Sequence, residues 1–282
     1  MAANDSGNMP FIRNLASSDR KTRTSALESL RTFLSASATA SRLTRLDNLK
    51  LWKGLYYSLW MCDRPIPQQN LCAELAGLID VLPDAAVAPW LAAFWEIMGR
   101  EWTGIDVLRL EKFMLLVRRV LGASLAWVCS ALSEAAATDP DGEGGDAEEE
   151  TEETKTSRRS RDRIDALLGN LADWPLETKD NLSRVPLGLR LHVLDIWIDE
   201  AEKLGLLDAE KTGEAGRQFL DRLGLLVEAQ TKSTCKPVRM RAKEMLADDR
   251  LPWNGDETGD DEVDKSVRNE SGDKDSWDGF DD

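Results

Sequence analysis

Residues 43–62, LTRLDNLKLWKGLYYSLWMC, decide the fold of this 282-residue chain. Leucine, tryptophan and tyrosine occupy nine positions between residues 46 and 60. At about 100° per residue they surround the whole circumference of a helix. A helix that is apolar all round must be covered on most sides. The stretch therefore predicts a central helix of an all-α domain, ended by the proline-containing turn 63–67.

Helical periodicity continues on both sides of this segment, whereas strand signals are nearly absent. Helices of moderate length joined by short turns favour a HEAT-like stack of antiparallel helices. No sequence period is clean enough to name a repeat family. The further helices predicted by apolar spacing and by proline or glycine breaks cover residues 10–16, 18–34, 68–81, 85–101, 107–137, 158–171, 186–204, 214–229 and 237–246.

The formal net charge of −15 is concentrated in two segments. Residues 139–153 hold nine acidic residues and no basic ones, and residues 248–282 hold fourteen acidic and four basic residues. The rest of the chain is mildly basic, with a net charge of +4. We predict one helical domain in two parts, 1–138 and 158–247, with an acidic disordered linker over 139–157 and an acidic tail over 248–282.

Basic side chains are dense over residues 19–53 and form a stripe on the helix predicted over 107–137, where Arg109, Lys112 and Arg119 share an arc of about 80°. Such a face can contact phosphates or acidic partners, although it is more often simply solvated. Exposed aromatic residues do not alternate with these side chains, so base-specific recognition is not predicted. The predicted RNA- or partner-binding residues are Arg20, Lys21, Arg23, Lys50, Lys53, Arg64, Arg109, Lys112, Arg118 and Arg119.

Three aromatic residues, Trp253, Trp277 and Phe280, lie in the acidic tail. Aromatic side chains in an aspartate-rich segment cannot build a core alone. They suit a short linear motif that docks on a basic or apolar groove. An inert tail is an equal alternative at this point.

Catalytic motifs are mostly missing from the sequence. The chain has no Walker-type phosphate loop, no GxGxxG and no GxSxG motif. A single histidine, His192, excludes multi-histidine metal sites, and its pairing with Asp195 one turn away is the one conceivable acid/base dyad. The acidic residues near Asp199 are expected on a solvated helix face. We predict no enzyme activity, no metal and no cofactor.

The remaining composition favours an intracellular protein. The four cysteines, Cys62, Cys72, Cys129 and Cys235, form no CxxC pair and are expected as buried reduced thiols. The N-terminus resembles no secretory signal, and the most apolar stretch, residues 85–95, is about half the length of a bilayer span. We expect a soluble cytoplasmic or nuclear protein with no membrane partner.

Three blocks of sequence resemble a known family. They are Phe11–Arg23, Leu49–Pro65 with its Leu-Trp-Lys-Gly-Leu core, and Phe94–Phe113. These blocks resemble the nucleolar ribosomal RNA-processing protein 1 family, of the Nop-fifty-two type, and the likeness extends from Phe11 to about Ala247. The resemblance implies a HEAT-like fold and a non-enzymatic role in nucleolar pre-60S particles, where such proteins support precursor rRNA processing. It also implies assembly-factor partners, including Brix-domain proteins, and a position near ribosomal RNA.

The acidic tail departs from the long basic extensions of some family members, so the folded body is expected to supply any RNA contacts. The leading hypothesis is a nucleolar scaffold that touches the backbone of precursor or large-subunit rRNA. The alternatives are a generic helical-repeat adaptor without RNA contact and an RNA-processing enzyme.

Overall fold

The computed structural model describes residues 10–137 and 152–254. These residues form eleven α-helices and two 3₁₀ helices, with no strand among them, which confirms the all-α prediction. The helices are α1 (Pro10–Leu15), α2 (Arg20–Ser35), α3 (Ser37–Ala40), α4 (Arg45–Trp60), α5 (Pro65–Ala76), η1 (Gly77–Val81), α6 (Asp84–Glu101), η2 (Trp102–Gly104), α7 (Val107–Ala137), α8 (Glu152–Asp173), α9 (Leu187–Lys203), α10 (Ala209–Gln230) and α11 (Lys236–Leu246).

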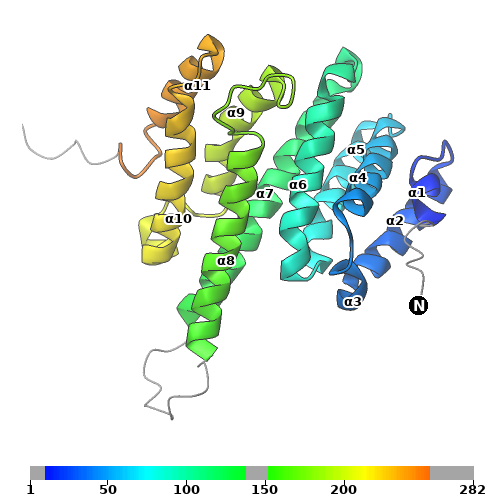
Figure 1. The fold of residues 1–282 in the computed structure, drawn as a ribbon, viewed down its shortest axis with the longest axis horizontal. Coiled ribbons are helices and arrows are strands. Elements are labelled where there is room, and N and C mark those ends of the chain that lie inside the picture. Colours follow the sequence, from blue (N-terminus) through cyan, green and yellow to red (C-terminus); the bar gives the residue numbers. More distant parts are fainter. Residues whose placement is uncertain (1–9, 138–151, 255–282) are drawn as a thin grey trace, which may run out of the picture.

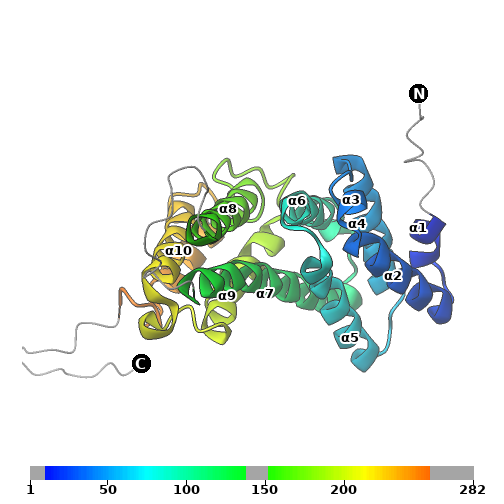
Figure 2. The same cartoon turned by 90° about the horizontal axis from the view of Figure 1, so that it is seen from below.

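Alternate helices of the chain build two layers. In one layer α4 packs on α6, α6 on α8 and α8 on α10. In the other, α5 packs on α7, α7 on α9 and α9 on α11. Figure 2 shows α8, α6 and α4 in one layer and α9, α7 and α5 in the other, and Figure 1 shows successive helices side by side along the molecule. This arrangement is the HEAT-like stack of antiparallel helices that the sequence predicts.

The helix predicted over residues 43–62 is α4, and it is covered on most sides as expected, but it lies toward the N-terminal end of the stack and not at its centre. It begins at a capping box in which the Thr44 hydroxyl and the Asp47 carboxylate each accept a backbone N–H of the other residue. Trp52 is 2% exposed and donates its indole N–H to the Trp90 carbonyl oxygen at 2.9 Å. However, Leu46 and Tyr57 are 58% and 38% exposed, so one side of this apolar helix has no covering helix in the described chain.

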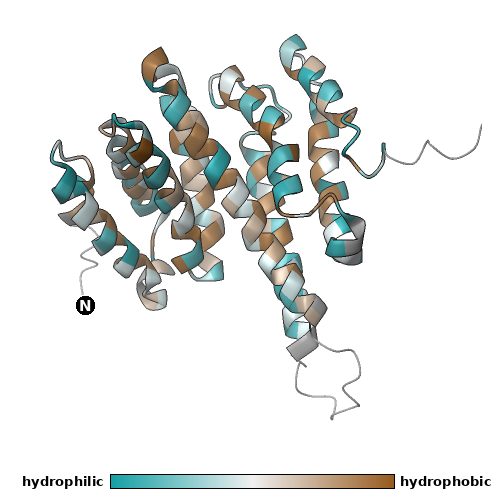
Figure 3. Cartoon of the chain, turned by 180° about the vertical axis from the view of Figure 1, so that it is seen from behind, coloured by the Kyte–Doolittle hydropathy of each residue, from teal (hydrophilic) through white to brown (hydrophobic). Residues whose placement is uncertain are grey.

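α7 contains the longest apolar segment of the described chain. By length and composition Val107–Ala135 could cross a membrane, which the shorter stretch at residues 85–95 could not. Phe113, Val117 and Val120 of α7 have no exposed surface, and the helix packs against α5, α8 and α9. This packing is that of a core helix, and Figure 3 shows polar and apolar residues alternating along the neighbouring helices as amphipathic packing requires.

Two predicted boundaries of the acidic segments need correction. α8 begins at Glu152, so residues 152–157 are helical and do not belong to the linker. Acidic residues are favourable in the first turn of a helix because they face its positive dipole end, whereas the prediction assigned them by charge alone. Residues 248–254 pack on the body, since Leu251 is fully buried. The rest of the predicted linker and tail, residues 138–151 and 255–282, lies outside the described residues.

The two helical parts share one hydrophobic core. Its buried residues run from Leu15 in α1 to Leu251 beyond α11. The connection between α8 and α9 is fastened by Arg190, whose side chain has no exposed surface. Arg190 donates to the Glu177 carbonyl oxygen at 2.6 Å and forms an ion pair with the Glu177 carboxylate.

The four cysteines are reduced, as predicted, but only Cys62 and Cys72 are buried. Cys129 and Cys235 are half-buried. Burial raises the pKa of the Cys72 thiol to about 12 and that of Cys129 to about 11. These thiols are therefore protonated and unreactive at neutral pH.

Candidate binding surface

The ten predicted basic residues separate into two groups. Five are exposed and five are engaged inside the protein. The exposed group is Arg20, Lys21, Lys50, Arg64 and Arg119, and the engaged group is Arg23, Lys53, Arg109, Lys112 and Arg118.

Arg23 is a structural residue, contrary to its predicted place on a binding surface. Its side chain is 8% exposed and donates to the carbonyl oxygens of Ser17 and Ser18, both at 2.9 Å. A third hydrogen bond, at 3.3 Å, reaches the Met61 carbonyl oxygen. The guanidinium thus joins the start of α2 to the end of α4, a contact between segments that the sequence does not place together.

Lys112 is also buried, which breaks the basic stripe predicted on α7. It is 4% exposed, and its ammonium donates to the carbonyl oxygens of Trp60 and Cys62, both at 2.8 Å. Desolvation lowers the pKa of Lys112, although Asp63 at 3.7 Å acts in the opposite direction. Lys112 therefore satisfies the last carbonyls of α4, where a cation is favourable.

The neighbouring arginines of α7 are half-buried and paired. Arg109 forms an ion pair with Asp106, and its guanidinium lies 4.8 Å from the ring centroid of Trp60. Arg118 binds Asp199 and Glu200 of α9, with the contact to Glu200 at 2.6 Å. Of the four basic residues predicted on this helix, only Arg119 remains exposed.

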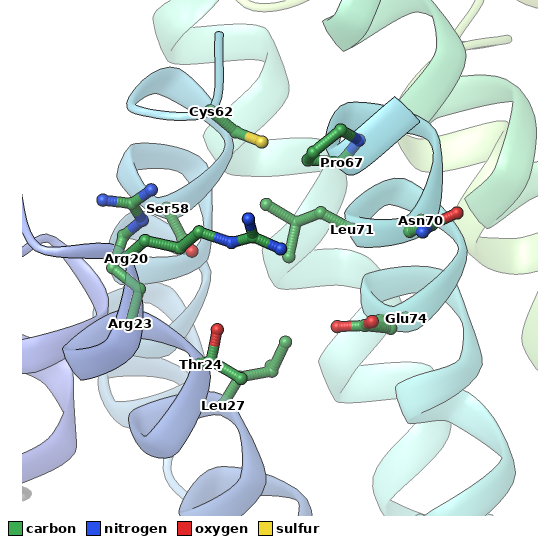
Figure 4. Close-up of a pocket in the computed structure, with 10 residues that line it drawn as sticks. All are labelled: Arg20, Arg23, Thr24, Leu27, Ser58, Cys62, Pro67, Asn70, Leu71 and Glu74. Atoms are coloured by element: carbon green, nitrogen blue, oxygen red, sulfur yellow. The ribbon is translucent and has the colours of Figure 1, made fainter. Parts of the chain in front are cut away.

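Arg20 lies beside a small pocket between α2 and α5. Figure 4 shows Arg20 and Arg23 on the α2 side and Asn70 and Glu74 on the α5 side. The pocket measures about 160 Å³, and its polar groups are mixed in charge. It therefore suits a small polar contact rather than an extended ligand.

Lys50 and Lys53 lie on the rim of a larger groove between α1, α4 and α6, which we call the α4 groove. Its volume is about 510 Å³, and its floor includes Ile12, Leu46 and Tyr57. Lys53 pairs with Glu101 at 2.6 Å and lies 4.9 Å from the ring centroid of Tyr57. The complete lining is Ile12, Arg13, Ala16, Leu46, Leu49, Lys50, Lys53, Gly54, Tyr57, Ile97, Arg100 and Glu101.

A further basic cluster on α8 was missed by the sequence predictions. Five of the nine residues over 155–163, KTSRRSRDR, are basic, and this density was the available signal. Arg163 is buried and donates to the Trp127 carbonyl oxygen at 2.6 Å, while Arg159 pairs with Asp84 and Glu134. Lys155, Arg158 and Arg161 are exposed, so α8 adds a basic surface to the predicted set.

The groups considered for catalysis do not come together. Nε2 of His192 lies 2.9 Å from the Met114 carbonyl oxygen, and burial lowers the pKa of this imidazole. Asp195, the conceivable acid/base partner of His192, pairs with Arg241 of α11. The predicted solvated acidic face is also wrong in part, because Glu200 is buried and bound by Arg118. Among the described residues, no three potential metal ligands form a group.

Of the predicted tail aromatics, only Trp253 is described, and it packs on the body. Its ring lies over Gly224 of α10, where an added Cβ would be 2.8 Å from the indole. Trp253 nevertheless remains 41% exposed and lines a shallow apolar pocket with Leu225 and Leu246. Trp277 and Phe280 lie outside the described residues.

Sequence comparisons give the same family as the resemblance. Residues 6–279 match the profile of a family described as nucleolar protein, Nop52. The mouse ribosomal RNA processing protein 1 homolog A is 33% identical over 79% of this chain and 40% of its own length. Its human counterpart is 29% identical over 79% of this chain and 42% of its length. A Drosophila melanogaster ribosomal RNA processing protein 1 homolog is 36% identical over 39% of this chain and 17% of its own length. The chain thus spans well under half the length of these curated relatives.

Proposed function

This chain belongs to the Nop52 family of nucleolar proteins, and from that premise we propose that it is a non-enzymatic ribosome biogenesis factor. Its relatives are named for ribosomal RNA processing. In this proposal the chain is a scaffold of the nucleolar pre-60S particle that supports precursor rRNA processing. Its partners are assembly factors, including Brix-domain proteins, and the backbone of precursor or large-subunit rRNA.

The observation that carries the proposal is the exposure of basic side chains at several places along the stack. Lys50 lies at the α4 groove, Arg20 and Lys21 on α2, Arg119 on α7 and Arg161 on α8. A helical stack presents an extended surface, and basic side chains spread along it can contact phosphates without reading bases. Arg23 and Lys112 bind backbone carbonyls inside the protein. The proposed RNA contacts are therefore limited to the exposed basic residues.

The proposal is tested by reversing charge only at exposed positions. A variant carrying Arg20→Glu, Lys21→Glu and Lys50→Glu is expected to keep its helical circular dichroism but to lose co-sedimentation with pre-60S particles. The control carries Lys232→Glu, Lys236→Glu and Lys243→Glu, three substitutions outside the proposed set. Co-sedimentation of the wild type with small-subunit precursors alone would contradict the proposal.

Two alternatives make different predictions in the same system. A protein-only adaptor predicts that ultraviolet crosslinking in native particles joins the exposed basic residues to protein and never to RNA. An RNA-processing enzyme predicts metal-dependent cleavage of precursor rRNA by the purified chain, abolished by one acidic substitution. The proposal expects RNA crosslinks and no cleavage.

A further inference from the structure

The α4 groove has an apolar floor that no helix of the described chain covers. Leu46 and Tyr57 project from α4 with 58% and 38% of their surfaces exposed. Large apolar side chains gathered in one groove mark a site of interaction more often than single exposed ones do. The groove therefore offers apolar side chains that an occupant with apolar anchors would bury.

The rim of this groove selects an acidic occupant. Four cationic side chains line it, Arg13, Lys50, Lys53 and Arg100, against one carboxylate, Glu101. Lys53 pairs with Glu101 and Arg100 with Glu96, while Arg13 and Lys50 are exposed. An acidic peptide with apolar anchors would match both the rim and the floor.

The chain itself carries such a peptide in residues 275–282, DSWDGFDD. Trp277 and Phe280 are three residues apart and are flanked by aspartates at 275, 278, 281 and 282. We propose that this segment docks in the α4 groove of its own chain, with the two aromatic side chains on the floor and the aspartates at the basic rim.

The other grooves of the described chain fit this segment less well. The apolar pocket beside Trp253 is lined by Asp221 and Glu228, which repel aspartates. The pocket between α2 and α5 is small, at about 160 Å³. The groove between α6 and α8 has a basic side, but it holds two carboxylates, Asp84 and Asp162, and its apolar lining is three alanines and Trp127. The α4 groove instead combines large exposed apolar side chains, Leu46 and Tyr57, with four cations and one carboxylate.

The tether is long enough to reach the groove. Twenty-two residues, 255–276, separate the last described residue from Trp277, the first aromatic residue of the proposed motif. Fully extended, they can span about 75 Å. The helix packing from α10 through α8 and α6 to α4 takes three steps, or about 30 Å, and a 22-residue helix such as α8 is about 33 Å long. The distance across the stack is well below the reach of the tether.

Docking would also cover Lys50 and Lys53 and so compete with phosphates for them. This consequence rests on the proposed function, whereas the docking itself does not. The test below therefore contains no RNA, so that a failure of docking is distinct from a failure of the RNA-binding proposal.

The test is zero-length carbodiimide crosslinking of the purified full chain, followed by peptide mass spectrometry. The expected product joins the Lys50 amine to a carboxylate of residues 275–282. Its yield should fall about tenfold in the Trp277→Ala/Phe280→Ala variant and in Leu46→Asn, because each removes apolar contacts of the docked motif. The matched control is Leu225→Asn, because Leu225 is 61% exposed and lies outside the α4 groove.

A mixture of ¹⁵N-labelled and unlabelled chains distinguishes docking within one chain from docking between two copies of the chain. Crosslinks within one isotopic form support the proposal, and crosslinks between the two forms would assign the groove to a second copy and overturn it. The absence of a Lys50 crosslink also overturns the proposal. So does a crosslink yield that is unchanged in both the aromatic variant and the Leu46→Asn variant. A fluorescein-labelled peptide of residues 273–282 gives a second measurement, and it should bind the aromatic variant more tightly than the wild type, whose own segment competes. Equal or weaker binding to that variant contradicts the proposal.

Discussion

The ammonium of Lys112 lies at the carboxyl end of α4, where two backbone carbonyls accept its protons at 2.8 Å. Lys112→Met keeps the aliphatic length but leaves these carbonyls without their donor. We expect the free energy of unfolding to fall by about 2 kcal/mol, as for other lost hydrogen bonds to charged groups. The neighbouring Arg119 is exposed, and Arg119→Met is expected to change the free energy of unfolding by less than about 0.5 kcal/mol. Denaturant unfolding followed by circular dichroism measures both, and equal effects would contradict this assignment.

His192 is the one histidine of the chain and gives a prediction for pH. Burial lowers the pKa of its imidazole below the ordinary 6.5, so near that pH the unfolded chain binds more protons than the folded chain. Stability from this group is therefore complete above pH 6.5 and is lost as the pH falls toward the lowered pKa. We expect the urea midpoint to decrease from pH 7.5 to 5.5 in the wild type and to change less in His192→Gln. A wild-type midpoint that rises over this interval would contradict the prediction.

Individual side chains were predicted least well from the sequence, and Arg23 and Lys112 show why. Each lies near the apolar stripe of its helix, where charge alone indicates a solvated position. Each reaches a backbone carbonyl at the end of α4, 38 residues away for Arg23 and 52 for Lys112, and Arg23 also binds the carbonyls of Ser17 and Ser18. No periodicity within one helix contains that information, so a charge-based assignment of binding residues fails where two helix ends meet.

Glycines at helix contacts give a prediction at the scale of the elements. At Gly99 of α6 an added Cβ would lie 2.5 Å from the Arg184 carbonyl oxygen, which is backbone and cannot move cheaply. Gly169 of α8 has no such neighbour within 4 Å. Gly99→Ala is expected to lower stability by about 1–3 kcal/mol, and Gly169→Ala to raise it by up to about 1 kcal/mol through helix propensity. The thermal midpoints of the two variants should therefore shift in opposite directions. Shifts of the same sign would contradict the close packing at Gly99.

Helices were predicted better than single residues, because their signals are local. The apolar pattern at residues 43–62 and the turn after it located α4 to within two residues at each end. The prediction failed at α8, where residues 152–157 were assigned by acidity although they form the first turns of a helix. Composition outweighed periodicity there. The predicted helix over residues 214–229 is confirmed, because Gly213 has a positive φ of 60° and separates residues 209–212 from the helix that follows.

At the scale of the molecule, the α4 groove could not be predicted from the sequence. Its lining comes from α1, α4 and α6, between Ile12 and Glu101, and only the order of the stack joins them. Lys50 and Lys53 were predicted as binding residues, whereas Arg13 and Arg100 were not. The sequence indicated the basic character of this part of the body, and tertiary packing determined where the basic side chains border an apolar floor.

The position at which the C-terminal segment leaves the body gives a truncation prediction. Leu251 is fully buried and Trp253 covers Gly224, so residues 248–254 contribute to folding. A chain shortened after Asn254 keeps the contacts of Leu251 and Trp253. A chain shortened after Ala247 loses these contacts and is expected to unfold several degrees lower, because burying one leucine contributes about 2 kcal/mol. Equal midpoints for the two truncations would contradict the packed position of this segment.

The same truncation after Asn254 tests whether the acidic C-terminal segment competes with RNA for the basic side chains of the body. Residues 255–282 contain twelve acidic and three basic residues, so their removal changes the formal net charge of the chain from −15 to −6. An acidic segment competes with RNA phosphates for basic side chains, and this competition is electrostatic and therefore screened by salt. We expect the shortened chain to bind a non-specific RNA several-fold more tightly than the full chain at about 50 mM salt, with the difference disappearing near 0.5 M. Filter binding across a salt series measures both affinities. A full chain that binds RNA as tightly as the shortened one at low salt would mean that the acidic segment does not act on the basic surface.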